Sequence, residues 1–109
     1  VRYLRKLGFV ILTTNYRTIL GEIDIVAREE NILAFIEVKT RSSGDYGLPQ
    51  EAVDHRKQHK LCRMAHAFLN DRGDHGMVCR FDVVAVLTGA GGRTREIELI
   101  RDAFNESSE

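Results

Sequence analysis

The stretch of residues 21–41, GEIDIVAREENILAFIEVKTR, decides the expected fold of this chain. It contains two runs rich in Ile, Val and Phe, at residues 22–29 and 32–41, and such runs are typical of β-strands. Only the polar pair Glu30-Asn31 separates them. The stretch therefore predicts a β-hairpin closed by a two-residue turn.

A two-residue turn fixes which residues of the two strands face each other. With Glu30 and Asn31 in the turn, Asp24 is expected opposite Glu37, and Glu22 opposite Lys39. Directly opposed side chains have Cβ atoms roughly 5 Å apart. The register therefore predicts two carboxylates and a lysine close together.

Side chains of a strand alternate between the two faces of its sheet. In the first strand, this alternation places Asp24 and Val26 on one face, and Ile23, Ile25 and Ala27 on the other. Because apolar residues occur on both faces, both sides of the hairpin are expected to be covered. Charged residues on a covered sheet face usually have a functional role.

Two opposed carboxylates repel each other unless a cation lies between them. Mg²⁺ prefers hard oxygen ligands of this kind, so Asp24 and Glu37 are candidate ligands for Mg²⁺ or Mn²⁺. Lys39 is expected on the same face and is suited to stabilise charge on a phosphate, with Glu22 as an outer supporting contact. The simpler alternative is a charged surface hairpin in which Glu22 and Lys39 form a weak ion pair.

The remaining sequence predicts a single α/β domain over residues 1–104 around one mixed central sheet. The apolar patterns and the positions of Gly, Pro and capping residues predict the remaining elements. They are a helix at 1–7, strands at 9–15, 78–88 and 95–100, a loop at 42–50, a helix at 54–71, a turn at 89–92 and a frayed polar tail at 105–109. The expected order is helix-strand-strand-strand-helix-strand-strand. Asp82, within the apolar run FDVVAVL, is expected to be an ion-pair partner rather than a third metal ligand.

The composition is that of an ordinary globular protein. The 109 residues include 16 basic and 16 acidic side chains, so the net charge favours no partner, and any nucleic-acid footprint must be local. Two cysteines are too few for a disulfide framework, and no stretch resembles a signal peptide or a membrane span. A cytoplasmic protein is the expectation.

Basic and polar residues of the second helix are candidate nucleic-acid contacts. Lys57 and Gln58 are expected near the hairpin site, where they would touch a phosphate or simply form a polar rim. An outer stripe of the helix would follow a nucleic-acid backbone or be no more than a solvated face. The full set of candidates for DNA contact is Arg41, Arg56, Lys57, Gln58, Lys60 and Arg63.

The motifs GEIDIVA, FIEVKTR, RFDVVAV and IRDAF in combination resemble the YraN-type family of small bacterial proteins. That family is similar to Holliday-junction resolvases and has the restriction-endonuclease-like three-layer fold. The signature of this fold is an Asp followed by (Asp/Glu)-x-Lys. By position, Asp24 matches the lone Asp and Glu37-Val38-Lys39 matches the tripeptide, whereas Ile23 stands where the signature often has Pro.

The resemblance implies an endonuclease that hydrolyses DNA phosphodiester bonds, including those of branched or recombination intermediates, and it makes a homodimer plausible. Asp24 and Glu37 would hold the metal, and Lys39 would stabilise the transition state. Related nucleases carry a further acid on the first helix, and this chain is expected to begin after it. The alternatives are a catalytically inactive nucleic-acid-binding or adaptor module with the same fold, and a purely structural interaction domain.

Overall fold

The computed structural model describes residues 1–42, 55–73 and 77–104. The loop expected after Ser42, the helix cap expected at Asp54 and the expected polar tail 105–109 lie outside these residues. No helix in the described ranges is both long and apolar enough to cross a membrane.

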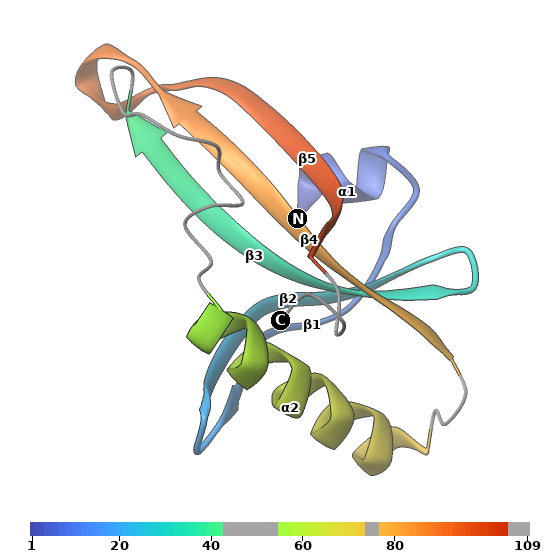
Figure 1. Cartoon of the computed structure of the whole chain (residues 1–109). Helices are drawn as coiled ribbons and strands as arrows, with labels where there is room; N and C mark the ends of the chain where they lie inside the picture. The colour runs from blue at the N-terminus through green and yellow to red at the C-terminus, as the bar shows by residue number, and fades with distance from the viewer. Residues whose placement is uncertain (43–54, 74–76, 105–109) are drawn as a thin grey trace.

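Apart from the short 3-10 helix η2 within the expected turn 89–92, the helices and strands of the described residues follow one another as expected (Figure 1). The first strand and the last strand are longer than the sequence pattern predicts. The elements are α1 (Arg2–Lys6), β1 (Val10–Thr18), β2 (Gly21–Glu29), β3 (Ile32–Ser42), α2 (His55–Arg72), β4 (Val78–Thr88), the short 3-10 helix η2 (Ala90–Gly92) and β5 (Thr94–Phe104).

The five strands form one sheet in the order β1-β2-β3-β4-β5. The pairs β1–β2, β2–β3 and β4–β5 are antiparallel, whereas β3 and β4 are parallel. Parallel neighbours need a crossover connection, and α2 lies within the chain that provides it. Over the described residues, the molecule is therefore an α/β protein with a mixed five-stranded sheet and two α-helices.

The predicted hairpin register is confirmed over the part of β2 and β3 that pairs. Ile25 is paired with Ile36 and Glu29 with Ile32, as a two-residue turn requires. Glu30 adopts a φ of 56° in this turn, a conformation that L residues rarely adopt. The described pairing of β2 with β3 ends at Ile25 and Ile36.

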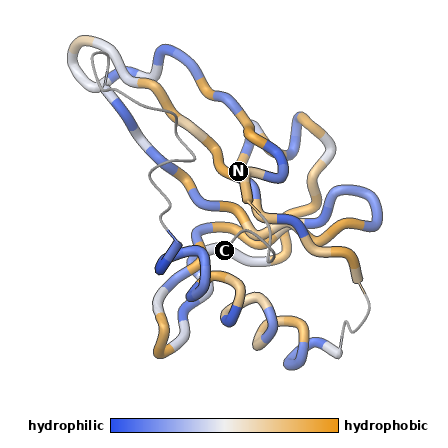
Figure 2. Tube along the Cα trace, in the orientation of Figure 1, coloured by the Kyte–Doolittle hydropathy of each residue, from blue (hydrophilic) through white to orange (hydrophobic). Residues whose placement is uncertain are grey.

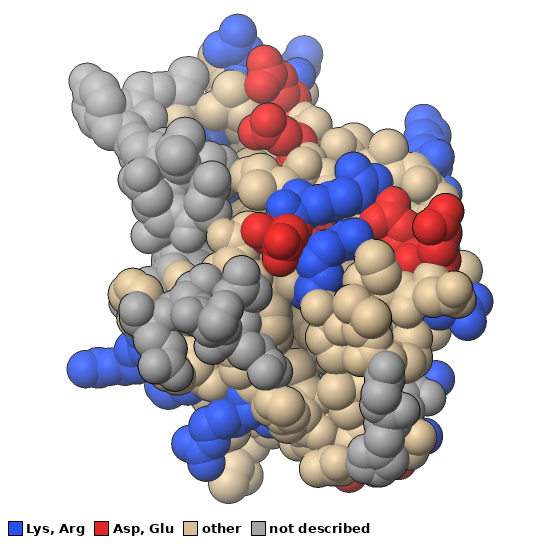
Figure 3. Space-filling view, turned by 45° about the vertical axis from the view of Figure 1, so that its right-hand side comes forward, with Lys and Arg blue, Asp and Glu red and all other residues tan. Residues whose placement is uncertain are grey.

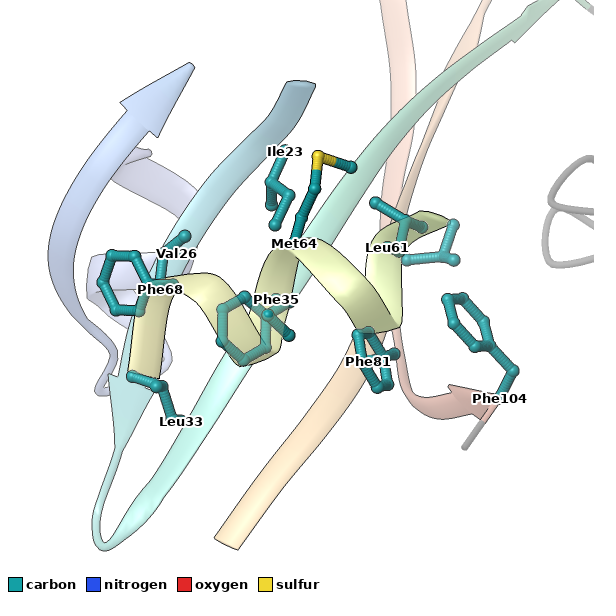
Figure 4. Close-up of a cluster of buried hydrophobic side chains, with 11 residues drawn as sticks. Ile23, Val26, Leu33, Phe35, Leu61, Met64, Phe68, Phe81 and Phe104 are labelled. Atoms are coloured by element: carbon teal, nitrogen blue, oxygen red, sulfur yellow. The ribbon is translucent and has the colours of Figure 1, made fainter. Parts of the chain in front are cut away.

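The sheet carries a hydrophobic cluster on each face. One cluster packs under α2, whose buried stripe is Leu61, Met64, Ala65 and Phe68 (Figure 4). In this cluster the Phe35 ring makes edge contact with Phe68 at a centroid distance of 5.8 Å. The second cluster contains Leu4 of α1 together with Phe9, Ile25, Ala27, Ala34, Ile36 and Val84. Figure 2 shows the corresponding hydrophobic colour in the central strands.

The expected position of Ile23 on the face of Ile25 and Ala27 is wrong. Ile23 is fully buried in the cluster under α2, beside Met64 (Figure 4). From Ile23 back to Gly21, β2 stays paired with β1 but not with β3, and the β1–β2 ribbon turns toward α2 (Figure 1). This change of direction carries Ile23 to the other cluster.

An ion-pair network joins β2, β4 and β5 near the hairpin turn. Arg80 lies 2.8 Å from an oxygen of Asp82 and 2.7 Å from an oxygen of Glu29, and Arg101 lies 2.7 Å from the other Glu29 oxygen. Asp82 is almost fully buried and also accepts a hydrogen bond from the Asp102 amide at 2.9 Å. Asp82 is thus an ion-pair partner, as expected. In Figure 3, basic and acidic side chains likewise lie side by side in a central group.

Candidate active site

The site begins where β2 and β3 part. The backbone N–H of Val38 donates a hydrogen bond of 2.8 Å to Asp24 Oδ2. A side chain on one strand thus accepts from the backbone of the other, beyond the last described pair at Ile25 and Ile36. Because Val38 stands between Glu37 and Lys39 in the chain, this bond brings Asp24 to the predicted tripeptide.

Glu37 is the acidic centre of the site, and its residue is only 5% exposed. Its Oε2 atom lies 2.7 Å from the Nζ of Lys57 on α2 and 3.9 Å from the Nζ of Lys39 on β3. A buried carboxylate without a positive partner would carry a large desolvation cost. The two ammonium groups offset that cost.

The two lysines influence each other. Contact with the Lys57 ammonium and burial lower the pKa of Lys39, and Glu37 and Asp24 only partly oppose this shift. Burial lowers the pKa of Lys57 as well, but the hydrogen bond to Glu37 and further interactions outweigh burial and raise that pKa above its ordinary value. Both lysines feel the charge of Asp24, so the four groups form one electrostatic unit, defined here as the Glu37 cluster: Asp24, Glu37, Lys39 and Lys57.

The donor set of the Glu37 cluster fits a hard divalent cation. Mg²⁺ is commonly held by one or two carboxylates, with waters and substrate phosphates completing its shell. Asp24 and Glu37 would supply the carboxylates, and the ammonium of Lys57 at Glu37 shows that a positive group is accommodated there. Within residues 1–42, 55–73 and 77–104, no group of three or more His, Cys, Asp or Glu side chains is arranged to hold a metal ion.

The expected pairing of Glu22 with Lys39 is wrong. Glu22 faces Arg17 across the β1–β2 ribbon, and its Oε2 atom lies 2.6 Å from Arg17 Nε. The reason is again the parting of β2 from β3 beyond Ile25, which leaves Glu22 with a partner on β1 only. Lys39 instead shares Glu37 with Lys57.

The candidate residues for DNA contact lie in two places, with Arg41 on β3 and the others on α2. Arg56 and Lys60 are exposed on α2, and together with Lys57 they line a pocket of about 330 Å³. Gln58 is half-buried in the same helix turn, and Arg63 is exposed one turn further on. The rest of the pocket is formed by Leu20, Gly21, Glu22, Leu61 and Met64.

Arg41 lies apart from this pocket. It is half-buried near the end of β3, where it pairs with Leu87 of β4, and its carbonyl oxygen accepts a hydrogen bond of 3.3 Å from the Thr88 hydroxyl. The structure therefore brings Lys57 to the predicted site but places Arg41 farther along the strand.

Sequence reasoning missed the pocket wall formed by Leu20 and Gly21. The available signal was the pair Ile19-Leu20, two large apolar residues in the turn between β1 and β2, where polar residues are usual. Ile19 is fully exposed, whereas Leu20 is half-buried and lines the pocket.

Comparison with known proteins agrees with the resemblance found in the motifs. Residues 1–86 match the model of the uncharacterised protein family UPF0102. A UPF0102 protein of Desulfosudis oleivorans is 46% identical over 104 residues, which cover 95% of this chain and 81% of the relative. A UPF0102 protein of Moorella thermoacetica is 52% identical over 97 residues, covering 89% of this chain and 81% of the relative. This chain therefore belongs to the uncharacterised, YraN-type protein family UPF0102.

Proposed function

We propose that the protein is a metal-dependent endonuclease that hydrolyses DNA phosphodiester bonds, built on a restriction-endonuclease-like fold. The observation that carries the proposal is the Glu37 cluster, in which Asp24 is tied to the Glu37-Val38-Lys39 tripeptide by the Val38 amide. Two carboxylates beside two lysines suit a reaction in which a cation and a phosphate must be held together.

In the proposed mechanism, Asp24 and Glu37 would hold Mg²⁺ or Mn²⁺. The bound cation would lower the pKa of a coordinated water toward neutrality and offset negative charge on the phosphate. Lys39 donates to a non-bridging phosphate oxygen and stabilises the charge that develops there. A new P–O bond forms to the water oxygen, which gives up a proton to solvent, as the opposite P–O ester bond breaks. The leaving oxygen takes a proton from solvent, so the products are a phosphate monoester and a free hydroxyl end.

Lys57 of α2 also has a role in the proposed mechanism. In the structure its ammonium is held by Glu37, and it is still 38% exposed. Because its stem is flexible and partly exposed, Lys57 would be able to reach a phosphate if Glu37 held a cation instead of this ammonium. Lys57 would then help to position the strand beside Lys39.

The test is cleavage of a panel of labelled DNAs (linear duplex, single strand, flap and four-way junction) with Mg²⁺ or Mn²⁺. We expect cleavage by the wild type and its loss in Asp24→Asn, Glu37→Gln and Lys39→Met. Matched controls are Glu98→Gln and Lys6→Met, which remove exposed charges on β5 and α1. No cleavage by the wild type, or equal cleavage by the site variants, would reject the nuclease.

A catalytically inactive nucleic-acid-binding module is the second candidate. The ion pair between Glu37 and Lys57 favours it, because this carboxylate already has a positive partner of its own. Such a module would bind the same DNAs without cutting them, and its affinity would be insensitive to Mn²⁺. Calorimetry with Mn²⁺ separates the two candidates, since only the nuclease is expected to release heat that Asp24→Asn abolishes.

A further inference from the structure

The pocket beside the Glu37 cluster has two kinds of wall. Leu20, Leu61 and Met64 line it with apolar side chains, and Arg56, Lys57 and Lys60 line it with basic ones. Its volume of about 330 Å³ is at the small end of the range for ligand sites in proteins. A pocket with this lining suits a ligand that is flat and apolar at one end and anionic at the other.

The charges around the pocket favour an anion. Arg56, Lys57 and Lys60 contribute three positive groups, whereas Glu22 contributes one carboxylate, which is held by Arg17 at 2.6 Å. Glu22 faces the pocket from β2 and is half-buried. A carboxylate in this position is suited to accept from the amino group of a nucleobase.

Lys57 connects the pocket to the Glu37 cluster. The same side chain lines the pocket and lies 2.7 Å from Glu37 Oε2. A phosphate bound at Lys57 would therefore border both the pocket and the candidate metal ligands. A nucleotide whose base entered the pocket would have its phosphate at the reacting end of the site.

The turn next to the pocket offers a further contact. Ile19 directly precedes Leu20 and is fully exposed, with no packing of its own in the structure. Proteins that unstack DNA use exposed apolar side chains of this kind against base steps. Enzymes that receive an unstacked base enclose it between apolar side chains.

We propose that the pocket between the β1–β2 turn and the first turns of α2 binds the base of an unpaired nucleotide of the DNA strand, next to the phosphodiester that is cut. This inference rests on the proposed function, because it makes the pocket a subsite of the nuclease. It names the substrate class: DNA in which a nucleotide beside the scissile phosphate is unpaired. Lys60 and Arg56 bind the neighbouring phosphates.

The test measures binding without cleavage, so that it is independent of catalysis. Fluorescence anisotropy in EDTA compares a short labelled single strand with its blunt duplex. Lys60→Gln is the pocket variant and Arg63→Gln is the matched control, since both remove one exposed positive charge from α2 but only Lys60 lines the pocket. We expect Lys60→Gln to weaken single-strand binding roughly five- to tenfold more than Arg63→Gln does, with equal effects on the duplex.

A second measurement asks whether a base occupies the pocket. Abasic nucleotides placed through the single strand should weaken binding to the wild type, roughly fivefold or more, and this loss should shrink in Leu20→Ala. Equal effects of Lys60→Gln and Arg63→Gln, or no penalty from abasic sites, would overturn the proposal even if the protein cuts DNA. Tight binding of a free deoxynucleoside monophosphate without any preference for single strands would also overturn it.

Discussion

The Nζ atom of Lys57 lies 2.7 Å from Glu37 Oε2, closer than the Nζ of Lys39, which lies 3.9 Å from the same oxygen. Of these two lysines, the nearer one to the buried acid therefore comes from α2 and not from the strand motif. The divalent cation that we propose at Glu37 would have to compete with that ammonium. This competition would make Lys57 a determinant of metal affinity.

We expect Lys57→Gln to bind Mn²⁺ roughly two- to fivefold more tightly than the wild type, because a partly exposed ion pair is worth up to about 1 kcal/mol. The same variant should bind DNA more weakly, since a phosphate partner is lost. Calorimetry measures the first effect and anisotropy the second. Lys60→Gln, which removes a charge from the same helix without a described bond to Glu37, serves as the control, and a similar gain in that variant would contradict the competition.

Two substitutions at Asp24 separate its structural role from its chemical one. In Asp24→Asn the amide oxygen still accepts the Val38 N–H, so stability should stay within about 1 kcal/mol of the wild type. Asp24→Leu leaves this N–H without its acceptor, and should cost about 1–3 kcal/mol in a urea titration. Both variants should lose Mn²⁺ binding. Equal stability of the two variants would show that the Val38 bond contributes nothing.

The Glu29 network predicts a pH dependence of stability. Hydrogen bonds from Arg101, together with Arg80 and against the effect of burial, lower the pKa of Glu29 to about 2, from 4.5. The folded state thus binds the Glu29 proton less readily than the unfolded state, so this stabilisation is complete above pH 4.5 and is lost as the pH falls toward 2. The shift corresponds to about 3 kcal/mol at most, and solvent screening at the exposed Arg101 reduces our expectation to ~1–2 kcal/mol.

The measurement is urea unfolding of the wild type and Glu29→Gln from neutral pH down through the range between the two pKa values, 4.5 and about 2, as far as the folded state persists. The two proteins should differ most at neutral pH and converge as the solution becomes acidic. Glu98→Gln, at an exposed position of β5, is the control. A difference that grows toward acidic pH would contradict the assigned direction.

The hairpin turn predicts a stabilising substitution. Glu30 holds a φ of 56°, which glycine adopts without the steric penalty of a side chain. Allowing for the greater freedom of glycine in the unfolded chain, we expect Glu30→Gly to raise the free energy of unfolding by about 0.5–1 kcal/mol. Asn31→Gly, at a position without positive φ, should lower it by a similar amount. Thermal denaturation compares the two variants. If Asn31→Gly is as stable as Glu30→Gly or more stable, this explanation of the turn is wrong.

Much of the fold was predictable because short-range rules determine it. The two-residue turn fixed the pairing of Ile25 with Ile36, and the local sequence pattern predicted the helix at 54–71 that the structure describes as α2. Pairing between distant strands was not predictable in this way. Nothing local to β3 indicates that its second neighbour is β4 in parallel register, with Ile32 beside Val78.

The errors at the site have one physical origin. Extending the hairpin register past Ile25 assumed that β2 and β3 stay paired, whereas the Asp24 side chain takes the Val38 amide and the strands part. Glu22 and Ile23 therefore received the wrong neighbours. Alternation along a strand predicts a face only while the strand keeps its partner.

The ion-pair network shows another limit of the sequence. Arg80 and Asp82 share a face at a spacing of two, which is a visible signal, and the pairing of Asp82 was expected. Glu29 and Arg101 lie far apart in the chain, and only the sheet order brings them together. Their contact could therefore be identified only from the structure.

The parallel pairing of β3 with β4 has a consequence for how the chain folds. Asp24, Glu37 and Lys39 belong to one hairpin, whose local contacts close a short loop and are entropically cheap to form. Lys57 and the walls supplied by α2 arrive only when the chain passes back over the sheet and β4 docks beside β3. We therefore expect the acids to be brought together before their helical partner during synthesis or refolding, and the docking of the crossover to be the kinetic barrier.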